Sequence, residues 1–371
     1  MGPLLRPGGR GRLKPILVRD LALERWPSMD RYAEALIARM PDAVVPDAWR
    51  MGGPRYLSRY WRYPRALRGT AGDLVHVLDH SYAHCLRAFR GRPSVVTVHD
   101  LLPLRTLAEG ARGPRGRLRD ALLRGTLRWI ERASRLIVST QFTAHEVERY
   151  LGVPNEIVRV IPYGVDPHFF VRPPEDAVTV RRAEWLHRTG RTGDTLVILH
   201  VGSCHPRKNV ETAISALGLV RARNVDAILV QIGGTFDAHQ KDVIQAAQVR
   251  QQVVQESAVS ETALVSAYAA ADMLIMPSTF EGFGLPVVEA MAAGLPVITS
   301  GAGGLREVAE EAALITSALS PEALADEILK LHADPMLRAG LVAVGRQRAA
   351  SLTWESAVAQ TRALYAELLA A

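Results

Sequence analysis

The feature that most constrains the fold of this 371-residue chain is an alternation of short β-branched runs with helical stretches, which occurs twice. The first half predicts strands at Ile16–Val18, Leu74–Leu78, Ser94–Val98, Arg135–Ser139 and Val158–Ile161. The second half predicts strands at Leu196–Val201, Ala227–Ile232, Met273–Met276 and Pro296–Thr299. Strands that alternate with helices form parallel sheets covered on both faces. The chain also exceeds the length that one core usually supports, so we expect two doubly wound α/β domains.

The expected helices fill the intervals between these strands. Over Ser28–Met40 the apolar residues fall on one helical face, and Ser28 is placed to cap that helix. In the second half, helices are expected near Val210–Arg221, Glu261–Ala270, Pro286–Ala293 and Ser320–His332. Gly294 then stands where a C-terminal glycine cap belongs.

The boundary between the two domains is expected between Pro162 and Arg191, where proline, glycine and polar residues interrupt the alternation. We therefore predict a first domain over residues 1–165 and a second over residues 166–352. In such domains, ligands bind beyond the carboxyl ends of the strands, here in a cleft between the two.

Composition indicates a reducing compartment and an anionic partner. No run of about 18 apolar residues is present, the Gly-, Pro- and Arg-rich start lacks the apolar core of a signal peptide, and Cys85 and Cys204 match no disulfide framework. Residues 1–165 carry 28 Lys and Arg against 15 Asp and Glu, whereas residues 166–371 carry 17 against 23. We expect a cytoplasmic protein whose basic half meets a membrane surface, a nucleic acid or an acidic acceptor.

The strongest constellation of polar residues is the run from Glu281 to Glu289, which follows the expected strand Met273–Met276. Pro286 suits a first helical turn, so both carboxylates can face the same cleft. Gly282 and Gly284 allow backbone N–H groups to approach a ligand closely. Carboxylates beside free amides suit a polyhydroxylated ligand. Taken singly, Glu281 is better explained as a solvated loop residue and Glu289 as an acid that stabilises a helix N-terminus, whereas the whole run favours a binding site.

A second constellation follows the strand Leu196–Val201, where Arg207 and Lys208 precede an expected helix. Two cations beside a helix N-terminus favour a diphosphate, although the segment also fits a solvated basic loop. His99 and Asp100 follow the strand Ser94–Val98, either as site residues or as a satisfied structural histidine and a capping acid. Motifs for zinc or serine-hydrolase chemistry are missing from the sequence, so we expect no metal and no cofactor.

These motifs closely resemble those of the family 4 retaining glycosyltransferases, which have the GT-B fold of two Rossmann-like domains. The matches are the E-x7-E pair Glu281 and Glu289, the run 277–297 around it, and the segments 206–209, 97–100 and 162–166. The resemblance also implies that residues 353–371 form a helix that crosses back and completes the first domain.

The resemblance implies a role for each candidate residue. Glu289 would bind the ribose hydroxyls of a nucleotide sugar, and Glu281 would hold the donor sugar with the amides of Gly282, Phe283, Gly284 and Leu285. Arg207 and Lys208 would neutralise the diphosphate beside Gly202 and Ser203, and His99 would touch the sugar from the other domain. The activity implied is transfer of a hexose-type sugar from a nucleoside-diphosphate sugar to an acceptor hydroxyl. Retention would proceed by front-face attack without a dedicated base or a metal.

Two departures keep other functions open. The family usually carries a glycine-rich loop after the first strand, but residues 19–30 contain no glycine, and Ser203 stands where arginine is common. The alternatives are a sugar-nucleotide 2-epimerase and a non-catalytic protein that binds sugar nucleotides. A nucleic-acid partner is not expected, because no aromatic RNA-binding motif accompanies the basic charge.

The sequence does not identify the acceptor, which could be a glycan, a lipid-linked sugar or a small molecule. Arginine and aromatic residues interleave over Trp49–Arg68, and seven more arginines lie within Arg105–Arg128. Such stretches suit peripheral docking on an anionic membrane, and equally a solvated arginine-rich face.

Overall fold

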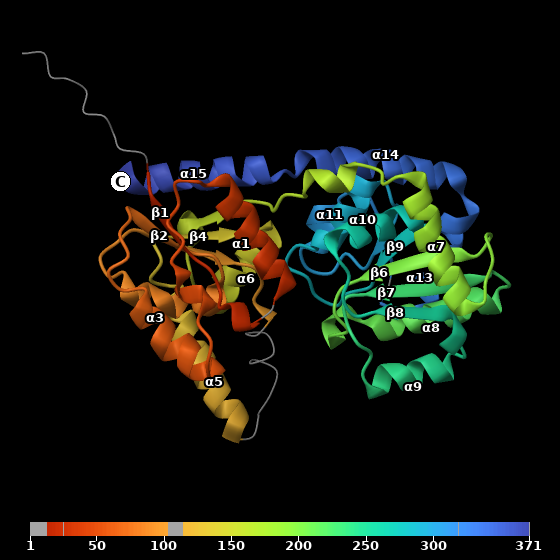
Figure 1. Ribbon diagram of the computed structural model, residues 1–371, viewed down its shortest axis with the longest axis horizontal. Coiled ribbons are helices and arrows are strands. Elements are labelled where there is room, and N and C mark those ends of the chain that lie inside the picture. The colour runs from red at the N-terminus through yellow and green to blue at the C-terminus, as the bar shows by residue number, and fades with distance from the viewer. Residues whose placement is uncertain (1–12, 25, 103–113, 318, 371) are drawn as a thin grey trace, which may run out of the picture.

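Two α/β domains lie side by side in the computed structural model, which describes residues 13–24, 26–102, 114–317 and 319–370 (Figure 1). The first sheet contains β1 (Pro15–Val18), β2 (Leu74–Val77), β3 (Ser94–Val98), β4 (Arg135–Val138) and β5 (Val158–Val160), in that order and all parallel. Val44 pairs with Ile16 on the free side of β1, so the chain passes to both sides of that strand. The sheet is therefore wound in both directions.

The second sheet has six parallel strands in the order β11-β10-β9-β6-β7-β8. Their bounds are β6 Leu196–Val201, β7 Ala227–Ile232, β8 Val253–Glu256, β9 Met273–Met276, β10 Val297–Thr299 and β11 Leu314–Ile315. The winding reverses between β6 and β9, and such a reversal opens a crevice at the carboxyl ends of the two strands. The prediction of two doubly wound domains is confirmed.

Helices cover both faces of each sheet. The first domain has α1 (Pro27–Arg39), α2 (Arg55–Leu57), a π-helical turn (Ser58–Arg62), α3 (Tyr63–Ala66), α5 (Pro114–Leu127) and α6 (Gln141–Leu151). The second has α7 (Glu175–Thr189), α8 (Val210–Ala222), α9 (Ala238–Ala246), α10 (Glu261–Ala270), α11 (Leu285–Ala293), α12 (Leu305–Ala309), α13 (Pro321–Ala333) and α14 (Pro335–Ser351). Short 3-10 turns lie at Ala22–Glu24, Asp47–Arg50, His80–Ala88, Asn155–Ile157, Pro167–Phe170, Pro206–Lys208 and Arg250–Gln252.

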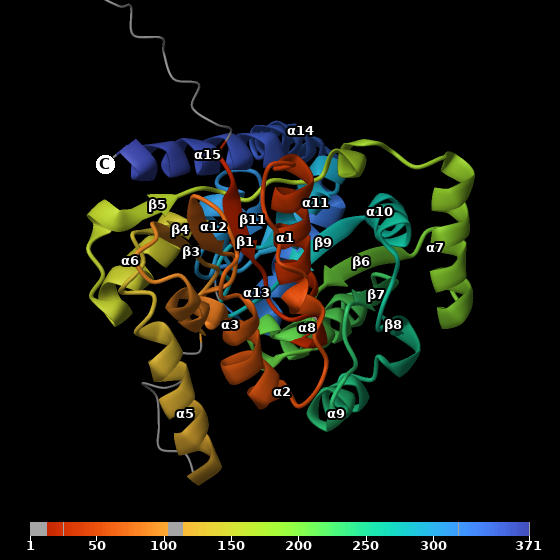
Figure 2. The same cartoon turned by 60° about the vertical axis from the view of Figure 1, so that its left-hand side comes forward.

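The last helix, α15 (Trp354–Ala370), returns to the first domain, as the resemblance implied. In both views α14 runs beside the second domain and α15 continues along the first (Figure 1, Figure 2). The Tyr365 hydroxyl lies 2.6 Å from His76 Nδ1 in the first sheet. The two connections between the domains touch where Val165 N donates to Leu352 O at 2.9 Å. A β-carbon at Gly164 would lie 2.0 Å from Trp354 N, so only glycine fits this crossing.

The predicted strands are all present within about a residue at each end, but β8 and β11 were missed. Both lie at sheet edges, are only four and two residues long and are mostly half-buried, so their local pattern is weak. The expected cap at Ser28 was wrong: α1 begins one residue earlier, at Pro27, because proline is favoured in a first turn. Gly294 does cap α11, with φ of 77°. Within the described ranges, no helix combines the length and apolarity needed to cross a membrane.

Candidate active site

The second domain brings two loops together because β6 and β9 are neighbours in its sheet. The loop after β6 carries Arg207 and Lys208, and the loop after β9 carries Glu281. Thr279 N donates to Arg207 O at 2.7 Å, and Asn209 Nδ2 donates to Pro277 O at 3.1 Å. These bonds join two segments that lie far apart in the sequence. The fold therefore brings the two motifs together.

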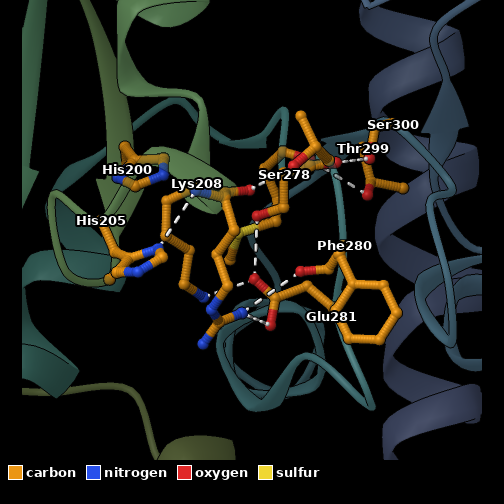
Figure 3. A network of polar contacts seen from close by, with 12 residues as sticks. His200, His205, Lys208, Ser278, Phe280, Glu281, Thr299 and Ser300 are labelled. Carbon is orange, nitrogen blue, oxygen red and sulfur yellow. Dashed lines mark hydrogen bonds and ion pairs between the residues drawn. The ribbon is translucent and has the colours of Figure 1, made fainter. Parts of the chain in front are cut away.

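Glu281 is the centre of a buried charge cluster (Figure 3). Its Oε2 accepts a hydrogen bond from Arg207 Nη1 at 2.7 Å. Its Oε1 pairs with Lys208 Nζ at 2.6 Å and accepts from Ser278 Oγ at 2.9 Å. Burial alone would raise the pKa of Glu281, but the two cations outweigh it and lower the pKa to about 2. The carboxylate is ionised, and both cations point into the same small space.

Lys208 reaches this cluster across the backbone of Gly202. Gly202 has φ of 154°, and a β-carbon there would lie 3.2 Å from Lys208 Cε. The ammonium is nearly buried, with its side chain 8% exposed, and burial lowers the pKa of Lys208. Ser203, next along the loop, is exposed and makes no side-chain hydrogen bond within the described ranges. The loop thus presents one buried and one partly exposed cation, Arg207, at the end of the sheet.

The segment from Gly282 to Leu285 supplies unpaired backbone donors. Gly284, with φ of 98°, is the N-cap of α11, and Phe283 packs on Tyr163 with ring centroids 5.0 Å apart. In the part of the chain that the structure describes, the amides of residues 282–285 donate to no protein acceptor. Consecutive free N–H groups at a helix N-terminus attract anions and hydroxyl oxygens. This arrangement fits the sugar-binding role that the resemblance implied for these amides.

Glu289 lies on α11 and has partners different from those of Glu281. Its Oε2 accepts from the Tyr268 hydroxyl at 2.8 Å, and its Oε1 pairs with Arg31 Nη1. Burial raises the pKa of Glu289, and Arg31 opposes that rise. The structure therefore places Glu281 just before α11 and Glu289 beyond the first turn of that helix, and each acid has its own set of partners. Sequence reasoning missed both Arg31 and Tyr268, because neither has a local signal that points to Glu289.

His99 is buried at the carboxyl end of β3, and both of its ring nitrogens are engaged. Nε2 lies 2.8 Å from Leu78 O, so it must donate, and Nδ1 then accepts from the Tyr163 hydroxyl. Burial lowers the pKa of His99 to about 4, so the ring is neutral at pH 7. The adjacent Asp100 caps the next turn by accepting from Leu102 N at 3.1 Å. A contact between His99 and a donor sugar stays a prediction.

The two domains meet directly at this site. A β-carbon on Gly282 would lie 2.1 Å from His99 O, and Thr140 Oγ1 donates to Gly282 O at 3.0 Å. Glu307, on α12, accepts from the backbone of Gln141 at 2.9 Å, at the N-terminus of α6. The loop after β9 and the start of α12 are thus packed against the first domain. The described residues contain no cluster of three or more side chains suited to a metal ion.

Two facing Rossmann-like domains, with cations and acids at the carboxyl ends of the second sheet, match the GT-B architecture. Residues 21–169 match the family model described as Glycosyltransferase Family 4, and residues 181–348 match the model described as Glycosyl transferases group 1. Together the two models span most of the chain. The protein belongs to family 4 of the glycosyltransferases.

Relatives agree with this assignment. The chain is 28% identical to a D-inositol 3-phosphate glycosyltransferase of Paenarthrobacter aurescens, over 75% of this chain and 67% of that protein. It is 29% identical to an MMP alpha-(1->4)-mannosyltransferase of Mycolicibacterium hassiacum, over 94% and 86%. It is 25% identical to the O-antigen chain mannosyltransferase B of Escherichia coli, over 88% and 81%.

Solved structures show the same fold at lower identity. Sucrose-phosphate synthase of Thermosynechococcus elongatus aligns with a TM-score of 0.75 at 22% identity, over 97% of this chain and all of that one. Anabaena HepE, solved with UDP and glucose, aligns with a TM-score of 0.78 at 18% identity, over 96% and 100%.

Proposed function

We propose that this protein is a retaining glycosyltransferase that moves a hexose-type sugar from a nucleoside-diphosphate sugar to an acceptor hydroxyl. The observation that carries the proposal is the cluster of Glu281, Arg207 and Lys208 at the end of β6 and β9. It places two cations beside an ionised carboxylate and four free amides. A diphosphate needs the cations, and a sugar needs the hydrogen-bonding groups.

In this proposal, the donor diphosphate takes Arg207 and Lys208 as its partners when it binds. Both cations then face the bond that breaks, where negative charge develops on the leaving phosphate. Preorganised cations in a water-poor site stabilise that charge without having to reorganise. Glu281, released from part of its ion pairing, is free to accept hydrogen bonds from sugar hydroxyls. Glu289 accepts from the ribose.

Retention would follow from front-face attack, in which the leaving phosphate takes the acceptor proton. The state of His99 supports a reaction without a histidine base, because its neutral ring already uses both nitrogens. The cations also serve the phosphates in place of a metal. Relatives named as mannosyltransferases support a hexose-type donor.

A screen of nucleotide sugars by thermal stabilisation tests the donor, since a ligand at about 100 times its dissociation constant adds roughly 2.7 kcal/mol of stability. The stabilising donor is then incubated with and without candidate acceptors, and the anomeric configuration of the product is read by NMR. Release of the nucleotide, together with a glycosylated product that keeps the anomeric configuration of the donor sugar, supports the proposal. Conversion of the sugar to its 2-epimer would identify the epimerase instead. Tight donor binding without any turnover would indicate a non-catalytic binding protein.

Glu289→Gln provides the matched variant for this assay. It should reduce transfer by at least about tenfold, roughly 1.4 kcal/mol of transition-state binding. The amide retains the shape of the side chain but accepts fewer hydrogen bonds. A folded variant with the wild-type rate would remove Glu289 from the donor site.

We also propose that the protein works at the cytoplasmic face of a membrane, held by an aromatic and arginine-rich surface of residues 55–68, which include α2, the π-helical turn and α3. Tyr56, Leu57 and Trp61 are each at least half exposed on these turns. Arg62, Arg65 and Arg68 of the same segment are also exposed, and the Arg65 guanidinium lies 4.7 Å from the Trp61 ring centroid. Aromatic rings and arginine stems suit a membrane interface, where basic residues add roughly 1 kcal/mol each near an anionic surface.

Arg59 does not belong to this surface, although its sequence position suggested it. Its guanidinium lies 3.1 Å from the buried carboxylate of Glu24 and donates to Ser81 O at 2.7 Å. Arg55 pairs with the same acid at 2.5 Å. Residues 105–113 of the second basic stretch lie outside the described residues. A vesicle test should therefore replace Arg62, Arg65 and Arg68 with serine.

Binding to anionic phosphatidylserine vesicles should exceed binding to neutral phosphatidylcholine vesicles, fall with added salt and weaken in this triple variant. Equal sedimentation with both kinds of vesicle, or sedimentation with neither, would contradict membrane docking. A charged acceptor free in solution would then be the better explanation of the basic half.

A further inference from the structure

Glu289 is a buried carboxylate whose ionisation depends on its neighbours. It is 2% exposed, and the groups that face it come from three elements besides α11. Tyr268 on α10 donates a hydrogen bond, Arg31 on α1 forms the ion pair, and Asp166 and His168 lie in the connection that leads into the second domain. A buried carboxylate without a cation tends to take up a proton. The charge on Glu289 therefore depends on Arg31.

Arg31 comes from the other domain. It lies on α1, 258 residues before Glu289 in the sequence, and its guanidinium lies 6.0 Å from the centroid of Phe169. Its side chain is 28% exposed, so part of its head group still faces solvent. Among the guanidinium nitrogens of Arg31, only Nη1 has a hydrogen-bond partner in the described parts of the chain. The remaining N–H groups are available at the site where a ribose would meet Glu289.

We propose that Arg31 is a positioning residue for the nucleotide: it keeps Glu289 ionised and oriented so that the carboxylate accepts the ribose hydroxyls. This inference rests on the proposed function, since it needs a ribose at Glu289. A carboxylate only accepts hydrogen bonds, whereas a protonated acid uses one oxygen as a donor. Two ribose hydroxyls that both donate are therefore matched by the ionised form alone.

The ion pair explains how the first domain contributes to a site built mainly on the second. The segment 28–32 carries no glycine and so offers no glycine-rich backbone loop to a ligand. Through Arg31 it offers charge instead. Burial and Asp166 raise the pKa of Glu289, while Arg31 and the Tyr268 hydrogen bond lower it. Without Arg31, the pKa of Glu289 rises further and its ionised fraction at neutral pH falls.

The test measures the binding of UDP and GDP, together with their 2′,3′-dideoxy forms, to wild-type protein, Arg31→Ala and Arg31→Lys by titration calorimetry. Arg31→Ala should weaken binding of the better ribonucleotide by about tenfold at neutral pH, on the scale of one charge-assisted hydrogen bond. The loss should grow at about pH 6 and shrink at about pH 9, because ionised Glu289 returns as protons are removed. Arg31→Lys should keep most of the affinity.

The dideoxy nucleotides separate positioning from a structural effect, because they lack the hydroxyls that Glu289 would bind. Their affinity should be the same for wild-type protein and Arg31→Ala. Arg159→Ala is the control, because Arg159 also lies in the first domain, is half exposed and pairs with Glu367 at 2.8 Å, which is not one of the groups that face Glu289. It should change no nucleotide affinity.

Equal losses for ribo- and dideoxynucleotides, or a loss that does not vary with pH, would overturn the role of Arg31. Tighter ribonucleotide binding by Arg31→Ala would also overturn it, since Arg31 would then compete with the ribose. If the wild-type protein binds neither UDP nor GDP, the proposed function itself fails at this step. If the wild-type protein binds the nucleotide and Arg31→Ala binds it equally well, only the role of Arg31 fails.

Discussion

The variant Glu281→Gln tests the charge cluster at the centre of the site. In the native protein, Glu281 accepts hydrogen bonds from Arg207 and Ser278 and pairs with Lys208. A glutamine has a single acceptor oxygen and turns an NH2 group toward one of the two cations. That cation then loses its charge partner in a buried place, which is costly. We therefore expect a loss of stability as well as a loss of activity.

The size of the loss follows from the lowering of the Glu281 pKa from 4.5 to about 2. Lowering a carboxyl pKa by one corresponds to about 1.4 kcal/mol, so the ionised carboxylate contributes about 3 kcal/mol at neutral pH. For a domain of this size, each kcal/mol lowers the melting temperature by roughly 2–4 °C, which gives a drop of roughly 6–12 °C. The folded pKa is lowered, so this stability is present above pH 4.5 and disappears as the pH falls toward about 2. The difference in melting temperature between the wild-type protein and Glu281→Gln should therefore become smaller at acid pH.

Thermal unfolding at several pH values measures this difference, with Glu310→Gln as the control. Glu310 pairs with Arg348 at 2.9 Å but is 57% exposed. Its loss should cost less than about 1 kcal/mol, as for most surface ion pairs. A saturating nucleoside diphosphate should reduce the deficit of Glu281→Gln, because phosphate then neutralises both cations. Transfer should fall at least about tenfold.

The reasoning would be refuted by two results. One is a melting temperature of Glu281→Gln equal to that of wild type at neutral pH. The other is an equal deficit in Glu281→Gln and Glu310→Gln, which would show that burial of the cluster does not matter. A wild-type transfer rate in folded Glu281→Gln would separately remove this acid from catalysis.

Four further predictions concern the same site and its surroundings. Lys208→Ala should weaken nucleoside-diphosphate binding and turnover by about tenfold, and Arg207→Ala by less because Arg207 is more exposed; normal binding by the folded double variant in calorimetry would place the phosphate site elsewhere. Gly282→Ala adds a β-carbon 2.1 Å from His99 O, so steady-state kinetics should show a lower kcat/KM by at least about tenfold; wild-type kinetics would show that the domains need not meet there. Burial and neighbouring carboxylates raise the pKa of Asp20 from 3.8 to about 7, so the stability of the protein falls as the pH rises through that range. Asp20→Asn should therefore raise the melting temperature near pH 8 but not near pH 4, and an equal effect at both pH values would contradict this. Activity should survive EDTA because the cations serve the phosphates; a reversible requirement for magnesium or manganese would disprove it.

Local pattern was sufficient for the architecture of this protein. A strand buried on both faces in a parallel sheet must be an apolar run, so Met273–Met276 and Leu196–Val201 can be recognised without any neighbour. A polar residue in the loop that follows such a run is also predicted to lie at the carboxyl end of the strand. Glu281, Arg207 and Lys208 were found in this way. Edge strands such as Leu314–Ile315 are not recognised from the sequence, because too little of their surface is buried to require an apolar pattern.

The partners of these residues were decided by the tertiary structure alone. Glu281 meets both cations because β6 and β9 are neighbours, which is a property of strand order and not of spacing along the chain. Arg31 reaches Glu289 only because two domains close on each other. Arg59 and Arg62 look alike in the sequence, yet Arg59 pairs with Glu24, a buried acid from another turn, whereas Arg62 is exposed. The free energy of a charge depends on which groups surround it in space, and the chain order does not contain that information.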